Sequence, residues 1–206
     1  MKTFYLFSLL LFLFTGSNAQ VTLRPGVRAG ANFSQITRTY YEPRTDFYFG
    51  ALGEIQLNNT FFLQPEIGFS RQGVKGEVYR LPEQGETDKV LIRKNIESNY
   101  LTWGVTGKLA FSRAVRILFG GSVEQSLEGR EAIKPLRSTM DISLMAGAEY
   151  RFPFGLGVEF RLKRGTHDMI DSREYETFSS NRWLAGDRNL NLVMQAGLNY
   201  AFPLTR

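Results

Sequence analysis

The chain has 206 residues, a length typical of one domain with a sizeable core. Its formal net charge of +5 is modest and its basic residues are spread along the chain, so nucleic acid is not an expected partner. The absence of cysteine excludes disulfides, thiolate metal ligands, a cysteine nucleophile and a lipid anchor on an N-terminal cysteine.

The first segment has the features of a secretory signal peptide. Lys2 precedes a short apolar run over 4–14, and Ser17-Asn18-Ala19 supplies the small residues of a cleavage site. The apolar run has about 11 residues, whereas a membrane-spanning helix needs roughly 20. We therefore expect residues 1–19 to be a cleaved signal peptide and residues 20–206 to form the mature domain in the cell envelope.

Apolar and polar residues alternate with a period of two through the rest of the chain, and no segment shows a helical period. Charged residues interrupt every later apolar stretch, so a membrane protein of this sequence must be a barrel. Strands are expected at 27–34, 47–57, 61–72, 100–111, 115–125, 140–152, 156–163 and 190–202. Pro65 lies inside the third strand, where it cannot donate to the ladder, and we expect a bulge there.

The connections between these strands alternate strictly between short turns and long loops. The long loops lie at 35–46, 73–99, 126–139 and 164–189. In an up-and-down barrel this alternation places the long loops at one end, and the turns with both termini at the other, as in outer-membrane barrels. The apolar content of 74–99 suggests that the flanking hairpin extends outward, with strand edges that a partner strand could join. Tyr175, Phe178 and Trp183 give the last loop aromatic side chains suited to recognition.

Two kinds of barrel fit the alternation: an outer-membrane barrel with its apolar face outward, and a soluble ligand-binding barrel with that face inward. The polar face is rich in glycine and serine, which suits the crowded interior of a small barrel. We therefore expect an all-β fold, an eight-stranded antiparallel up-and-down transmembrane β-barrel. The aromatic girdles expected at the two membrane interfaces are Phe61, Phe111, Phe152, Phe154, Tyr200 and Phe202 at the turn end, and Tyr40, Tyr41, Phe47, Tyr48, Tyr100 and Trp103 at the loop end.

Charged residues of both signs share the polar face, where a closed barrel would pair them. Eight strands leave little open lumen, so we expect these charges to form a plug with a structural role. The residues expected to form this lumen network are Glu54, Glu66, Arg116, Glu149, Arg151 and Arg161. A small channel remains an alternative function.

No catalytic, cofactor or metal site stands out in the sequence. His167, the only histidine, precedes Asp168, but no nucleophile motif accompanies the pair, and a solvated loop histidine is the simpler interpretation. One histidine without cysteine disfavours zinc. Glu83, Glu86 and Asp88 carry the oxygen ligands of a hard cation, but their spacing matches no calcium loop. We expect neither an enzyme nor a bound cofactor.

Several segments, in order along nearly the whole mature chain, resemble the PorT-like family of outer-membrane barrels. They are the opening strand at 26–34, Phe62-Leu63-Gln64-Pro65-Glu66-Ile67-Gly68-Phe69-Ser70, Gly147-Ala148-Glu149-Tyr150 and the closing segment at 197–202. Tyr100-Leu101-Thr102-Trp103-Gly104 lacks the proline frequent in that family. The resemblance implies an integral outer-membrane protein, inserted by the barrel-assembly machinery, in a family whose name comes from a member associated with type IX secretion. The expected partners are outer-membrane lipid, that machinery, and a protein or glycan at the extracellular loops.

Overall fold

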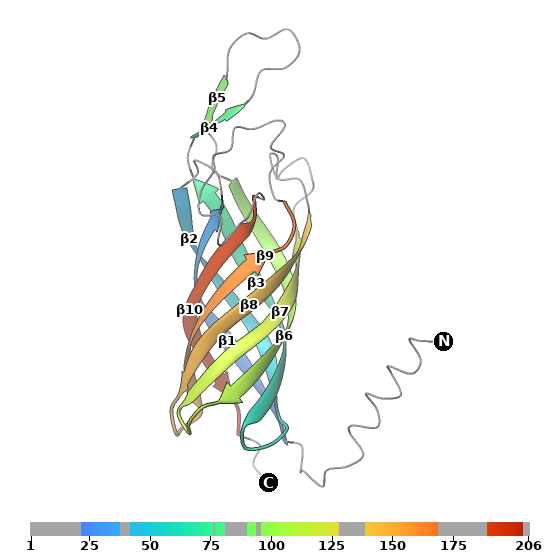
Figure 1. Ribbon diagram of the computed structural model, residues 1–206, viewed down its shortest axis with the longest axis vertical. Coiled ribbons are helices and arrows are strands. Elements are labelled where there is room, and N and C mark those ends of the chain that lie inside the picture. The colour runs from blue at the N-terminus through green and yellow to red at the C-terminus, as the bar shows by residue number, and fades with distance from the viewer. Residues whose placement is uncertain are drawn as a thin grey trace, which may run out of the picture.

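The computed structural model describes residues 22–37, 42–75, 77–80, 90–93, 96–127, 139–168 and 189–203. Within them, eight long strands close into an antiparallel barrel and two short strands form a separate ribbon (Figure 1). The barrel strands are β1 (Thr22–Ile36), β2 (Glu42–Gln56), β3 (Phe61–Lys75), β6 (Ile96–Ala110), β7 (Val115–Ser126), β8 (Met140–Arg151), β9 (Leu156–Gly165) and β10 (Asn191–Ala201). The ribbon strands are β4 (Glu77–Arg80) and β5 (Val90–Arg93). The described part of the chain holds no helix of the length and apolarity needed to cross a bilayer.

The predicted fold class is confirmed, with β1 closing the barrel against β10. The main difference from the expected strands lies in the second long loop. There β3 and β6 stay paired out to Val74 and Ile96. Beyond them β4 pairs with β5, and Figure 1 shows this ribbon projecting past the barrel. The apolar residues of this segment therefore extend the hairpin outward, as the sequence indicated.

The bulge predicted at Pro65 is wrong. β2 and β3 keep one register on both sides of the proline, and the irregularity lies between Pro43 and Tyr48. Gly53 of β2 is the neighbour of the proline ring, and a Cβ at Gly53 would lie 3.8 Å from Pro65 Cγ. Because that neighbour has no side chain, the ring fits without a change of register, and the proline removes only one hydrogen-bond donor.

The apolar face of the strands points outward. Phe49, Ile67, Phe119 and Phe160 are 47–53 % exposed, while the alternate positions face inward and are largely buried. A soluble barrel would bury these side chains, so the soluble alternative is wrong. An outward apolar band around a polar interior is the arrangement of an outer-membrane barrel.

The short turns fall at 57–60, 111–114 and 152–155, at the same end as the start of β1 and the end of β10 (Figure 1). In outer-membrane barrels the short turns face the periplasm, so we call this the periplasmic end and the opposite one the extracellular end. Gly155 completes the last turn with a φ of 95°, a left-handed conformation that favours glycine.

Most of the predicted girdle residues that the structure describes lie on the outer surface, but two do not. Tyr48 and Tyr100 are only 4 % and 3 % exposed and face the lumen. In each case the alternation along the strand places the neighbouring residue outside and the tyrosine inside. The prediction relied on the aromatic type of these two residues and was therefore wrong. Tyr40 and Tyr41 lie outside the described residues, as do the signal peptide, the loop acids Glu83, Glu86 and Asp88, and the loop aromatics Tyr175, Phe178 and Trp183.

Gly30 of β1 and Gly197 of β10 are register partners on the lumen face. A Cβ at Gly197 would lie 2.3 Å from both the Ala29 carbonyl oxygen and the Tyr48 hydroxyl. The close approach of the two strands and the position of Tyr48 therefore require glycine at this seam.

We expect Gly197→Ala to lower the free energy of unfolding by about 1–3 kcal/mol, because the added methyl displaces the Tyr48 hydroxyl. The matched control is Ala196→Val, one position away on the outer face, which should change stability by less than about 0.5 kcal/mol. Denaturant unfolding of the folded barrel in lipid measures both. A Gly197→Ala barrel with the wild-type midpoint would contradict the crowding at this seam.

The polar lumen as candidate functional site

All six residues expected in the lumen network lie on the inward face of the barrel. Glu54, Glu149 and Arg161 are essentially inaccessible, while Arg116 and Arg151 are 8 % exposed. The structure divides the six between two layers of ion pairs and adds further charged residues to each.

The periplasmic layer consists of Glu54, Lys108, Arg116, Glu149 and Arg151. Oε2 of Glu54 accepts hydrogen bonds from Lys108 Nζ at 3.3 Å, from Arg116 at 2.8 Å and from Arg151 at 2.7 Å. Glu149 accepts from Lys108 at 2.6 Å and from Arg151 Nε at 2.8 Å. Two carboxylates thus hold three cations, and each buried charge has a partner, as burial in a low-dielectric interior requires.

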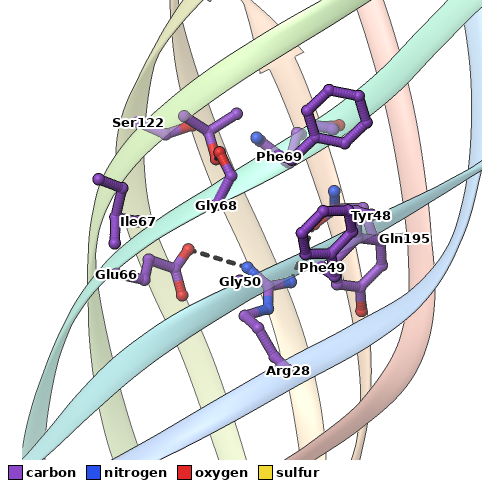
Figure 2. Close-up of a pocket in the computed structure, with 13 residues that line it drawn as sticks. Arg28, Tyr48, Phe49, Gly50, Glu66, Ile67, Gly68, Phe69, Ser122 and Gln195 are labelled. Carbon is purple, nitrogen blue, oxygen red and sulfur yellow. Dashed lines mark hydrogen bonds and ion pairs between the residues drawn. The ribbon is translucent and has the colours of Figure 1, made fainter.

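The middle layer consists of Arg28, Glu66, Glu159 and Arg161. Arg28 lies 3.0 Å from Glu66 and 2.8 Å from Glu159, and Arg161 lies 2.8 Å and 2.9 Å from the same two carboxylates. Figure 2 shows Arg28 bonded to Glu66 inside the lumen. Tyr48 donates a hydrogen bond to Glu159 at 3.1 Å, and its ring centroid lies 4.5 Å from the Arg28 guanidinium carbon. This closed square of charges from opposite sides of the barrel blocks the lumen at mid-height.

The extracellular layer consists of Glu124, Asp141 and Lys163. Lys163 pairs with Glu124, and Asp141 pairs with His167 at 3.2 Å. The extracellular layer holds two carboxyl groups and one lysine. The periplasmic layer holds two carboxyl groups and three cations, and the middle layer holds two carboxyl groups and two cations. The described lumen layers therefore contain six carboxyl groups and six cations.

Neutral side chains join the layers into one network. Gln195 accepts a hydrogen bond from Arg28 and donates one to Asn32, while Asn199 donates to both Glu159 and Glu149. The resulting chain of side-chain contacts runs from the extracellular to the periplasmic end through Asn191, Gln72, Ser70, Asn32, Gln195, Arg28, Glu159, Asn199, Glu149 and Arg151 to the Gly155 carbonyl. The interior is a plug of bonded side chains along its described length.

A small enclosed cavity lies beside the middle layer, lined among others by Arg28, Tyr48, Glu66, Ser122 and Gln195 (Figure 2). Its volume is about 20 Å³, which is room for about one water molecule. The lining is partly polar and partly apolar, and its charged members are already paired, so a water molecule suits this cavity better than an ion.

His167 lies in a loop and is exposed to solvent, as the sequence indicated, and it also contacts the rim of the lumen. Its ring is half exposed, but Nδ1 lies 3.2 Å from the buried Asp141 carboxylate and 3.2 Å from the Thr166 hydroxyl. Both contacts use the same ring nitrogen, so the histidine cannot relay a proton from the hydroxyl to the acid as a catalytic triad does. Asp168 instead accepts a hydrogen bond of 2.8 Å from the backbone N–H of Asn189. This bond joins the two ends of the last long connection.

Among the described residues, no three histidine, aspartate or glutamate side chains are grouped around a common point.

A second ionic cluster, which sequence reasoning missed, lies at the extracellular ends of β2, β3 and β6. Arg44 lies 2.6 Å from Asp46 and 2.5 Å from Glu97, and Arg71 also pairs with Glu97. Hydrogen bonds from Arg44 and Arg71 lower the pKa of Glu97 below its ordinary value, so it stays ionised at a lower pH than a free glutamate does. Arg44, Asp46 and Glu97 fell within predicted loops, so no strand alternation was available to relate them to Arg71.

A family model described as an outer membrane protein beta-barrel domain matches residues 18–171. No curated protein matches the chain. Among solved structures, the attachment invasion locus protein Ail of Yersinia pestis is 12 % identical, with 87 % of this chain and 98 % of that one covered and a TM-score of 0.48. Neisserial surface protein A is 11 % identical, with 88 % and 99 % covered and a TM-score of 0.49. The chain belongs to the outer membrane protein beta-barrel domain family and is an integral protein of the outer membrane.

Proposed function

We propose that this protein is a non-conducting barrel that anchors extracellular segments in the outer membrane and presents them to a protein or glycan outside the cell. The observation that carries this proposal is the side-chain network that fills the lumen from end to end. An ion crossing the barrel would have to separate the paired charges of each layer, and separating a buried pair is strongly unfavourable. The enclosed cavity beside the middle layer is too small to provide a path around them.

We expect the purified wild-type barrel to give no steady conductance in planar lipid bilayers. The comparison variant, Glu66→Ser with Arg161→Ser, removes one charge of each sign from the middle layer and should produce small unitary currents. Steady wild-type currents that persist after purification would refute the plug and support the channel alternative.

The β4–β5 ribbon is the described extracellular element best suited to a partner. An isolated two-stranded ribbon is marginally stable in water, and a third strand from a partner would complete it. The ribbon continues the β3–β6 hairpin, so the rigid barrel fixes its base.

Replacing residues 77–93 with a short glycine–serine turn should leave a barrel that still migrates faster unboiled than boiled in SDS. The same change should abolish chemical cross-linking of the protein to its surface partner on intact cells. Unchanged cross-linking would exclude the ribbon as the contact.

The resemblance of the strands to the PorT-like family supports a more specific setting for this role, in type IX secretion. Deletion of the gene should then reduce export of secreted cargo, and wild-type export in the deletion strain would place the protein in another process. Outer-membrane lipid and, during insertion, the barrel-assembly machinery are the further partners that this proposal implies. The function requires no catalysis and no cofactor.

A further inference from the structure

The periplasmic end of the barrel carries a surplus of positive charge. Its described strand ends and turns contain five cations, Arg24, Lys108, Arg113, Arg116 and Arg151, and two carboxylates, Glu54 and Glu149. Both carboxylates are 1 % exposed and belong to the periplasmic layer. Lys108, Arg116 and Arg151 are buried and pair with these carboxylates, so the charges that this end exposes among the described residues are Arg24 and Arg113, and the seven groups together carry a net charge of +3.

Three arginines surround the opening of the lumen. Arg24 lies on the inward face of β1 and is partly exposed; Glu54 is its register partner on β2, but the two form no ion pair in the described structure. Arg116 and Arg151 are buried apart from 8 % of their surface. The Arg116 guanidinium carbon lies 4.1 Å from the Phe62 ring centroid, and Arg151 donates to the Gly155 carbonyl at 2.9 Å. These contacts hold the two guanidinium groups in fixed positions.

Arg113, in the turn between β6 and β7, is the second arginine that this end exposes. The lumen-facing arginines sit inside the ring of strands, so they face the periplasmic space and not the surrounding lipid headgroups. The mouth of an eight-stranded barrel is narrow and admits an extended side chain. Arginines in this barrel already bind carboxylates, the group whose geometry matches a guanidinium.

We propose that the periplasmic mouth, formed by Arg24, Arg113, Arg116 and Arg151, binds an acidic segment of a soluble periplasmic protein. A carboxylate of that segment pairs with Arg24 at the mouth, and Arg113 holds a neighbouring carboxylate on the rim. The surplus charge attracts the segment over a distance, which raises the rate of association. The site lies at the opposite end of the barrel from the proposed extracellular contact and is independent of it.

The test measures binding of a fluorescent glutamate-rich peptide to the mature barrel in zwitterionic detergent at low salt, by anisotropy. The wild type should bind, and physiological salt should weaken the complex because exposed charges are screened. Arg24→Gln with Arg113→Gln should weaken binding by about tenfold. The matched control, Lys75→Gln with Arg164→Gln, removes the same charge from exposed positions towards the extracellular end and should change binding by less than about twofold.

Equal weakening in the two double variants would mean attraction to net charge alone and would overturn the proposal, as would a wild type that does not bind the peptide. Loss of peptide binding when the barrel is placed in nanodiscs containing phosphatidylglycerol would assign the arginines to lipid phosphates and would also overturn it. Faster unboiled migration in SDS confirms that each variant folds. If Arg24→Gln prevents folding, Arg113→Gln alone, in an exposed turn, should still weaken binding by about threefold, and an unchanged affinity would refute the site.

Discussion

Replacing Arg161 with leucine should lower the free energy of unfolding of the barrel by about 3–5 kcal/mol. Arg161 is completely buried and donates to Glu66 and Glu159. Leucine fills most of the space but leaves Arg28 alone to neutralise two carboxylates. The loss of stability is therefore caused mainly by a buried carboxylate that lacks a compensating cation, and less by lost packing.

The double variant Arg161→Leu with Glu66→Leu is the matched control for this effect. It leaves one cation and one carboxylate in the middle layer, so its stability should return to within about 1–2 kcal/mol of the wild type. Both variants are compared by denaturant unfolding in lipid. If the single variant is as stable as the wild type, or the double variant is less stable than the single one, the middle layer is not held together by charge pairing.

Phe119→Arg should destabilise the folded barrel by about 2–4 kcal/mol, because it places a charge in the hydrocarbon part of the bilayer. Phe119 lies in the middle of β7 on the outer face and is half exposed. The control is Gln125→Arg, on the same face of the same strand near its extracellular end, where the cost should fall to about 0–1 kcal/mol. Unfolding from lipid vesicles measures both. Equal costs would mean that the two positions do not differ in membrane depth.

The alternation of residue types was sufficient to predict the barrel, because a period of two assigns every strand residue to one of two faces. It placed Glu54, Glu149 and Arg161 inside the lumen, and it also placed Lys108 and Arg28 there, although neither was among the six residues expected to form the network. Alternation does not reveal which inward residues meet. Arg28 of β1 contacts carboxylates from β3 and β9, and that choice depends on the relative shift of strands around the whole barrel.

Local rules failed where neighbouring strands determine the outcome. Pro65 was expected to break the register, but the fit of its ring beside Gly53 depends on the residue that β2 places there. Tyr48 was assigned to the membrane interface by its type, whereas its place over the Gly30–Gly197 seam follows from strand pairing. The outward extension of the β3–β6 hairpin was indicated by the apolar content of 74–99, whereas the residues at which the pairing ends depend on both strands.

The position of Arg28 also bears on how this protein enters the membrane. The β1–β10 seam joins the two ends of the sheet, and Arg28 on one side of it pairs with Glu159 on β9, the strand next to β10 on the other. A sheet that is inserted but still open lacks this pair, and each charge keeps one other partner, Glu66 for Arg28 and Arg161 for Glu159. Closing the seam therefore gives both buried charges their second partner, and this gain favours the closed barrel over the open sheet inside the bilayer. The same ion pair that helps to block the lumen of the finished barrel thus also fastens its last seam.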